Sequence, residues 1–149
     1  MTNLKQTLTD SVKTAMKARE LEKFKVLRNV QAAIKQIEID RQTDLDDNET
    51  LEILQKQIKQ RQESLAIFTD NGRDDLAQKE QFELDVIQSF MPEQMSDDEL
   101  AQLVNAEIAE QGATGMQDMG RVMGALKAKT TGRADPAVIS QLVKQALQG

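Results

Sequence analysis

The sequence predicts an all-α protein, in which an N-terminal long helical hairpin or bundle is followed by a small C-terminal three-helix bundle. Only two prolines and seven glycines occur in 149 residues, a composition typical of long helices. Apolar residues recur at three- and four-residue spacing, as on one face of a helix. This pattern is interrupted at Met91-Pro92, where a helix cannot continue. We therefore place the domain boundary there, with domains at 1–92 and 93–149.

Two helices are predicted before residue 42. The first begins at Leu4, with Thr2 or Asn3 as its cap, and its apolar stripe slips out of phase at Arg19–Leu21. The second continues to about Arg41, and a single continuous helix through both is the alternative. The residues predicted to face inward are Leu8, Val12, Ala15, Met16, Phe24, Leu27, Val30, Ile34 and Ile37.

Two further helices complete the predicted N-terminal domain. Polar turn residues at Asp44–Asn48 precede a third helix, which ends at Asn71-Gly72, and a fourth runs from about Arg73 to Phe90. We expect the second and third helices to form an antiparallel hairpin, because a loop of turn residues joins them. The predicted inner residues are Leu51, Leu54, Ile58, Leu65, Phe68, Leu76, either Glu80 or Phe82, Leu84, Ile87 and Phe90.

Three shorter helices are predicted after the boundary. Ser96–Glu99 is a capping box, worth on the order of 1 kcal/mol, that opens a helix over 97–111. The same pattern at Thr114–Gln117 opens the next helix, with Gly132 just past its end. Asp135-Pro136 supplies a cap and a proline at the first position of the last helix. Their inward residues are Leu100, Leu103, Val104, Ile108, Met119, Val122, Met123, Leu126, Val138, Ile139, Leu142, Val143 and Leu147.

Composition excludes several classes of function. Cysteine and histidine are absent, so disulfides, thiolate or imidazole zinc sites and Cys/His or Ser/His nucleophilic machinery are ruled out. We expect no catalytic residues, no metal and no cofactor. No apolar run approaches the roughly 20 residues that span a bilayer, and the N-terminus shows no signal-peptide pattern. We therefore expect a cytoplasmic protein without a membrane partner.

Charge is distributed unevenly along the chain. The net charge of −6 argues against indiscriminate binding to nucleic acid. Two segments are nevertheless basic, since 13–35 holds seven basic and two acidic residues and 112–149 holds five and two. Tryptophan and tyrosine are absent and the four phenylalanines lie on core stripes, so any RNA contact is expected through phosphates and shape rather than base stacking.

The most informative segment is Gly120–Pro136. Gly120 and Gly124 leave one face of a helix without side chains, so that another backbone can approach closely there, with Met123 beside them. Four basic residues surround the end of this helix and the following turn, as phosphate contact requires. These residues are Arg121, Lys127, Lys129 and Arg133. The alternative is that the glycines serve packing and the basic residues form a solvated face that suits the helix dipole.

Other groups of residues have structural alternatives. If the second and third helices pair, Arg28 faces Glu63 and Arg61 faces Glu38, either as charged pairs along a seam or as a polar groove for a ligand. The acidic run from Asp44 fails the spacing of a calcium loop and favours a helix-capping turn. A third such group consists of five methionines, which either fill the core or form an adaptable groove for a partner. They are Met91, Met95, Met116, Met119 and Met123.

Several motifs of the sequence resemble those of a known family. The pattern G-x-V-M-G-x-L followed by G-R-A-D-P, over Gly120–Leu147, resembles the tail domain of GatB, the subunit of the tRNA-dependent amidotransferase that engages tRNA. A closer match, covering nearly the whole chain, identifies the sequence as a member of the GatB/YqeY family of stand-alone YqeY proteins. The motifs of this match are Val26-Leu27-Arg28, Ala32-Ala33-Ile34-Lys35, Lys56–Ser64, Gly72–Ala77 and Phe90-Met91-Pro92. The family's pattern has a glycine at the first helix break, where this chain has Arg19-Glu20-Leu21.

The resemblance implies a tRNA-associated module that is not itself an enzyme. Its expected partners are tRNA, or a protein such as an aminoacyl-tRNA or amidotransferase component; glutamine-dependent amidotransferase activity would exceed what these residues can do. The expected RNA contacts are Arg121, Lys127, Lys129 and Arg133, with a second strip formed by Lys13, Lys17, Lys23, Arg28 and Lys35. The alternative function is a protein-interaction adaptor that docks a partner helix on the face of Gly120, Met123 and Gly124 without binding RNA.

Overall fold

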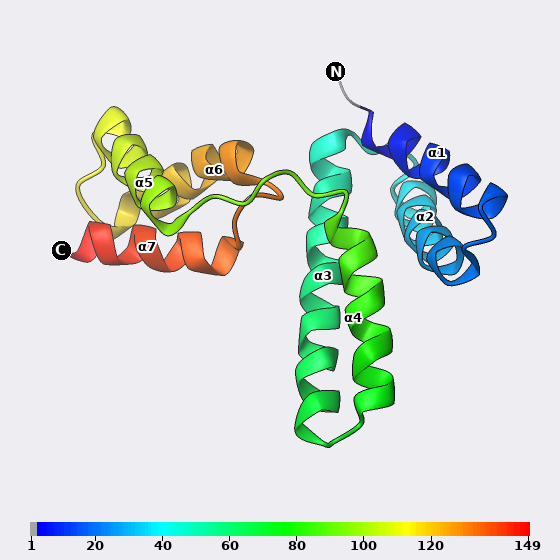
Figure 1. Cartoon of the computed structure of the whole chain (residues 1–149). Coiled ribbons are helices and arrows are strands. Elements are labelled where there is room, and N and C mark those ends of the chain that lie inside the picture. The colour runs from blue at the N-terminus through cyan, green and yellow to red at the C-terminus, as the bar shows by residue number, and fades with distance from the viewer. Residues whose placement is uncertain (1–2) are drawn as a thin grey trace. The chain divides into compact units, whose positions relative to one another are not determined.

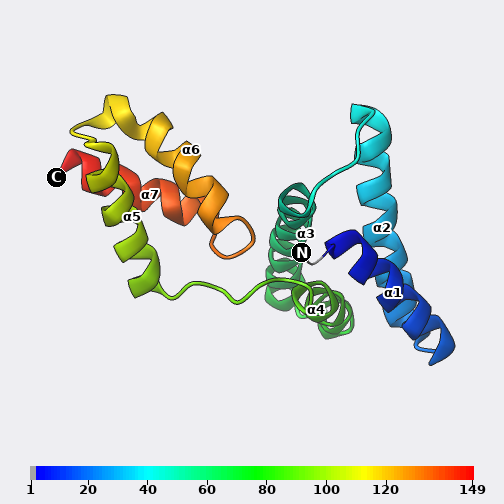
Figure 2. The same ribbon diagram turned by 90° about the horizontal axis from the view of Figure 1, so that it is seen from above.

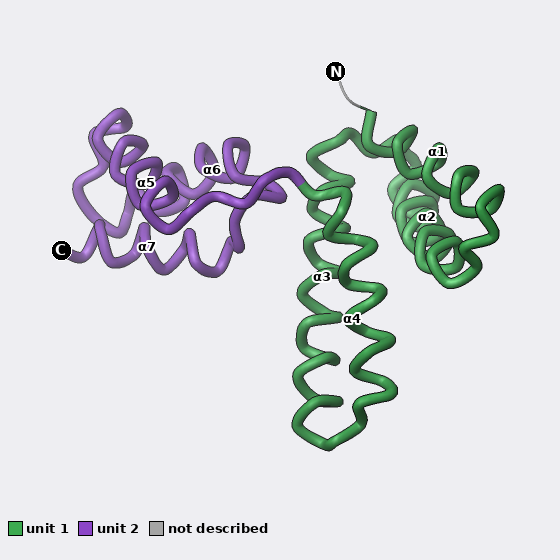
Figure 3. Tube along the Cα trace, viewed as in Figure 1, with its two compact units in different colours: residues 1–91 green, residues 92–149 purple. Residues whose placement is uncertain are grey.

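The computed structural model describes residues 3–149 and contains, over that range, seven α-helices, one short 3₁₀ helix and no strand. The predicted all-α fold class is therefore confirmed. Two compact units divide the chain between Met91 and Pro92, as Figure 3 shows. The elements are α1 (Leu4–Lys17), α2 (Leu21–Arg41), α3 (Asp47–Asp70), α4 (Asp74–Gln88), α5 (Asp97–Gln111), η1 (Met116–Asp118), α6 (Met119–Thr130) and α7 (Pro136–Gln148).

A tight turn separates α1 from α2, so the alternative of one continuous helix is wrong. Asn3 caps α1 by accepting a hydrogen bond from the amide of Gln6 at 3.2 Å, and Thr2 lies outside the described residues. Arg19 adopts a left-handed conformation with φ of 59°, and the next amide, of Glu20, donates back to Ala15. This is a conformation that glycine adopts without strain, and here arginine occupies it.

The helices of the first unit pair as α1 with α2 and α3 with α4 (Figures 1 and 2). The expected hairpin of α2 and α3 is wrong, because the short turns at residues 18–20 and 71–73 fold neighbouring helices back on each other. The two expected ion pairs do not form. Arg61 lies 3.4 Å from Glu83 on α4, and Glu38 pairs with Lys5 on α1.

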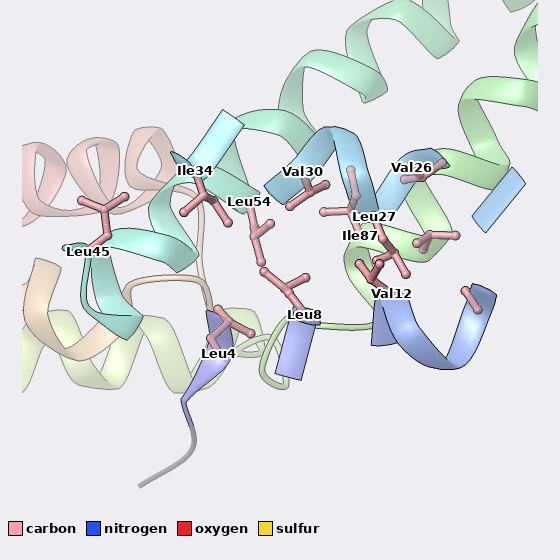
Figure 4. Packing of buried hydrophobic residues seen from close by; sticks show 12 residues of the cluster. Leu4, Leu8, Val12, Val26, Leu27, Val30, Ile34, Leu45, Leu54 and Ile87 are labelled. Carbon is pink, nitrogen blue, oxygen red and sulfur yellow. The ribbon is translucent and has the colours of Figure 1, made fainter. Parts of the chain in front are cut away.

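All four helices contribute to the core of the first unit. Leu8, Leu27, Leu54 and Ile87, from α1 to α4 in turn, are essentially inaccessible to solvent (Figure 4). Burying each stabilises the fold by about 1.5–3 kcal/mol. Of the side chains expected to face inward, Met16 and Phe82 are exposed instead.

The start of α3 is fixed by a capping box, which confirms the capping interpretation of the acidic run. Asp46 accepts from the amide of Glu49 at 2.8 Å, and Glu49 accepts from the amide of Asp46 at 3.3 Å. Asp47 also accepts from the amide of Leu4 at 2.9 Å, so the same loop holds the start of α1. These carboxylates thus bind backbone amides at the starts of α3 and α1.

The second unit follows the predicted helix boundaries closely. Ser96 accepts from the amide of Glu99 at 3.1 Å, and Asp135 caps α7 through the amide of Ala137 at 2.9 Å. The expected capping box at Thr114–Gln117 is wrong. Asp118 supplies the oxygen there, accepting from the amides of Thr114 and Gly115, because η1 tightens the start of α6.

Side chains from α5, α6 and α7 form the separate core of the second unit. Val104, Val122, Leu126 and Val143 are at most 1% exposed, and Met95, Met119 and Met123 pack against them. Met91 packs on the core of the first unit, so four of the five methionines are core filler, whereas Met116 and the expected inner residue Val138 are exposed.

Candidate nucleic-acid interface

The outward face of α6 carries two glycines with open space above them. Gly120 and Gly124 are exposed, and a methyl group added at either position would meet no heavy atom within 4 Å. On the opposite side of the same helix, Val122 and Leu126 are completely buried. Among the described residues of the second unit, none packs on the outward side of these glycines.

Lys127 and Arg121 are both exposed at this glycine face of α6. The 3.6-residue helical repeat puts Lys127 in line with the glycines and Arg121 at the edge of the face. Arg121 lies 3.0 Å from Asp118, and its side chain is 57% exposed. Hydrogen bonds from the amides of Thr114 and Gly115, with the charge of Arg121, hold the pKa of Asp118 below its ordinary value. Arg121 is thus positioned by an ionised carboxylate while its guanidinium stays accessible.

Lys129 points to a different side of α6, into the second unit. Its ammonium group donates to Glu107 on α5 at 2.8 Å, and the Glu107 side chain is only 6% exposed. Gln111 also donates to that carboxylate, at 2.7 Å. The hydrogen bond from Lys129 lowers the pKa of Glu107, and the same bond raises the pKa of Lys129. Lys129 is therefore engaged in holding α5 against α6.

Arg133 has a structural role as well. Its Nε donates to the carbonyl of Glu93 at 2.9 Å, and its guanidinium lies 3.8 Å from Glu99. Together with a bond from Met95 to the Arg133 carbonyl, these contacts fasten residues 93–95 to the turn between α6 and α7. The four basic residues of the tail thus do not form one cluster, because two lie on the glycine face and two hold the unit together.

The second basic strip is also divided by the fold. Lys13 and Lys17 lie exposed one turn apart on α1, and Lys23 lies 4.0 Å from Glu20. Arg28 and Lys35 line a groove between α1 and α2 that also contains Lys5. Sequence reasoning missed Lys5, because its place depends on α1 folding back onto α2. The short turn at Arg19–Leu21 was the available signal for that pairing.

Neither a membrane-spanning helix nor an acidic metal site occurs among the described residues. Among residues 3–149, no helix combines the length and the apolar character needed to cross a bilayer. Within the same range, no three acidic side chains lie close enough together to hold a metal ion.

The fold defines a class, the small all-α proteins built of two helical units. The chain belongs to the YqeY-like protein family, whose sequence model matches residues 5–147.

Curated relatives extend the comparison. The chain is 44% identical over 85 residues to altered inheritance of mitochondria protein 41, mitochondrial, of Eremothecium gossypii, covering 56% of this chain and 46% of that protein. The protein of the same name from Pyrenophora tritici-repentis is 29% identical over 143 residues, covering 94% and 78%. That of Saccharomyces cerevisiae is 38% identical over 85 residues, covering 56% and 46%. The chain thus spans about half the length of two of these relatives, the Eremothecium and Saccharomyces proteins.

The names of these relatives correct one expectation. All three are called mitochondrial proteins, which overturns the expected cytoplasmic location. None of the three names describes a catalytic activity.

Proposed function

We propose that this YqeY-like protein is a non-enzymatic, tRNA-associated module that contacts the sugar-phosphate backbone through the glycine face of α6. The proposal follows the resemblance of Gly120–Leu147 to the tRNA-engaging tail of GatB. By the same resemblance, the module is accessory to tRNA-dependent amidotransferase chemistry with glutamine as the amido donor. Multiple turnover of glutamine or ATP by the pure protein would contradict the non-enzymatic part of this proposal.

The openness of the two glycines is the observation that carries the proposal. A glycine inside a helix costs about 1 kcal/mol relative to alanine. Such a cost is commonly offset when a neighbouring backbone needs the space, but no described residue of the second unit lies there. A partner outside the chain that approaches α6 closely would use that space.

The charges on the same face favour an anionic partner. Arg121 and Lys127 are exposed beside the glycines, and phosphate contacts come largely from such side chains. Lys129 and Arg133 support the structure of the second unit instead, because Lys129 pairs with Glu107 and Arg133 donates to the carbonyl of Glu93. Replacing Lys127 should therefore weaken RNA binding more than replacing Lys129 does. The Lys127 variant should also remain folded.

Replacing Gly124 by alanine tests the proposal directly. The variant should be more stable to urea by about 1 kcal/mol, because alanine favours the helix and meets no atom. Its affinity for tRNA should nevertheless fall severalfold, since the added methyl group holds the phosphate backbone away. Fluorescence anisotropy of labelled tRNA, at two salt concentrations, measures this loss, and binding by the unaltered chain should weaken at the higher salt.

A charge-matched pair provides the control. Lys127→Gln should weaken tRNA binding, whereas Lys144→Gln, on an exposed position of α7, should leave it nearly unchanged. Equal losses in both variants would mean diffuse attraction, and undiminished binding by the Gly124→Ala variant would exclude the glycine face.

A second candidate, a protein-interaction adaptor, uses the same face. Met116 is 40% exposed one turn before Gly120, and an apolar side chain at that end suits a partner helix better than RNA. On this candidate, a protein partner would co-purify after nuclease treatment at high salt, and Gly124→Ala would release it. The two candidates are thus separated by what survives the nuclease.

A further inference from the structure

A groove of about 400 Å³ lies between α1 and α2 in the first unit. Its lining includes the buried Leu8 and Ile34 and the exposed Ala32. Its volume falls within the range of sites that hold small molecules. The groove therefore offers a hollow lined by apolar side chains and by Arg28 and Lys35, two members of the second basic strip.

Two side-chain bonds hold the walls of the groove in place. Gln31 on α2 donates to the hydroxyl of Thr9 on α1 at 3.2 Å. Lys5 on α1 donates to Glu38 on α2 at 2.7 Å, and Glu38 also accepts from the amide of Leu45 at 2.9 Å. Because α1 and α2 are tied at two levels, a ligand entering the groove meets walls that are already positioned.

The free charge of the groove is positive. The hydrogen bond with Glu38 raises the pKa of Lys5, and the same bond lowers the pKa of Glu38, so both stay ionised and cancel. Arg28 and Lys35 have no hydrogen-bond or ion-pair partner among the described residues. The two remaining positive charges lie seven residues apart on one face of α2, about 10 Å along its axis, with Ala32 between them.

We propose that this groove binds a small organic phosphate carrying about two negative charges. The guanidinium of Arg28 provides a fork that fits two oxygens of a phosphate, and Lys35 provides the second charge. The organic part of the ligand would lie over Ala32, which is exposed. This site lies in the first unit and does not depend on the glycine face of the second, so either proposal can fail without the other.

Titration of the full chain, labelled with nitrogen-15, with adenosine 5′-monophosphate, inorganic phosphate and adenosine tests the proposal. The monophosphate should shift amide resonances of α1 and α2 around the groove at millimolar concentration. Inorganic phosphate should shift the same resonances at higher concentration, and adenosine should have little effect. The absence of any shift at the groove with either phosphate would overturn the proposal.

Matched variants locate the site. Replacing both Arg28 and Lys35 by glutamine should weaken binding of the monophosphate at least about tenfold, because two charge-assisted contacts are lost. The control replaces Lys56 and Lys59, exposed on α3, by glutamine, which removes the same charge and should leave binding unchanged. Equal weakening by the two double variants would contradict the site.

A substitution that keeps all charges adds a steric test. Ala32→Leu fills the hollow, so the monophosphate should bind much more weakly while the fold is retained, because position 32 is exposed. Undiminished binding would mean that the ligand is attracted by surface charge outside the groove. Binding of long RNA through Arg28 and Lys35, without binding of the small phosphates, would equally overturn the proposal.

Discussion

Lys129 shows how a single basic residue can be committed to the fold. It was expected to contact RNA, yet its ammonium group is bonded to Glu107, whose carboxylate lies almost entirely out of solvent. A buried carboxylate that loses its partner is left with an uncompensated charge. Loss of the Lys129 side chain is therefore expected to lower the stability of the fold.

Replacing Lys129 by methionine should therefore destabilise the protein more than replacing Lys144 by methionine. The pKa of Glu107 is lowered by Lys129, so the pair stabilises the fold above 4.5, the ordinary pKa of a glutamate, and this contribution is lost as pH falls through the lower folded value. The difference in unfolding free energy between wild type and variant should shrink in acid. Urea unfolding at neutral and acidic pH measures it, and a constant difference would contradict the assignment.

Arg19 concerns the backbone rather than a side-chain bond. It adopts a left-handed conformation, which costs a non-glycine residue about 1–2 kcal/mol. Glycine avoids this strain, but it loses more conformational entropy on folding, at a cost of about 0.5–1 kcal/mol relative to alanine. Arg19→Gly should therefore stabilise the chain by about 0.5–1 kcal/mol in urea unfolding. Lys17→Gly, within α1, is the control and should destabilise it by about 1 kcal/mol. Destabilisation by both would mean that the Arg19 side chain outweighs the strain.

At the scale of elements, short connections decide which helices pair. The three-residue turns after α1 and α3 create two hairpins, and the longer connection after α2 joins one hairpin to the other. Residues from the beginning of α3 and the end of α4 join the core with α1 and α2, whereas the opposite ends of α3 and α4 contribute no residue to that core. The capping box at the start of α3 therefore lies where both hairpins meet.

Loss of this cap should destabilise the first unit. Asp46→Ala removes the bond that the Asp46 side chain accepts from the amide of Glu49, and should cost about 1 kcal/mol in urea unfolding. Asp44→Ala, an exposed substitution two residues earlier, should change stability by less than about 0.5 kcal/mol. Similar effects of the two substitutions would show that local charge, rather than the cap, is responsible.

At the scale of the whole molecule, the described residues form two separate hydrophobic cores. The buried residues of each unit come from that unit alone, and the strap at residues 93–95 belongs to the second unit through its bonds to Gly132 and Arg133. The functional proposals are divided in the same way, with the groove in the first unit and the glycine face in the second.

Each core should therefore support folding of its own unit. A fragment of residues 92–149 is expected to fold as a helical domain of modest stability, because a chain of this size buries only about 60% of its unfolded surface. A fragment of residues 96–149, which keeps the Ser96 cap, should be less stable, since it lacks the strap at residues 93–95. Circular dichroism during heating measures the melting temperatures of the two fragments. Equal melting temperatures would show that the strap does not stabilise the second unit.

Particular residues show how much of this could be predicted. Asn3, Asp46, Ser96 and Asp135 were recognisable as caps because each acts within three residues of its own position. The cap at Asp118 was missed, because the 3₁₀ turn before α6 displaced it from the usual spacing. The partners of Lys5 and Lys129 could not be predicted, since they lie 33 and 22 residues away in the chain.

The sequence by itself determined the all-α class and most helix boundaries, because periodicity, caps and turns act over a few neighbouring residues. Only the tertiary structure decided which helices pair and which charges remain accessible. Packing brought Glu107 to Lys129 and Glu38 to Lys5, while it left Arg28, Lys35 and the glycine face open. Contacts across long separations depend on the arrangement of whole helices, and no local pattern encodes that arrangement.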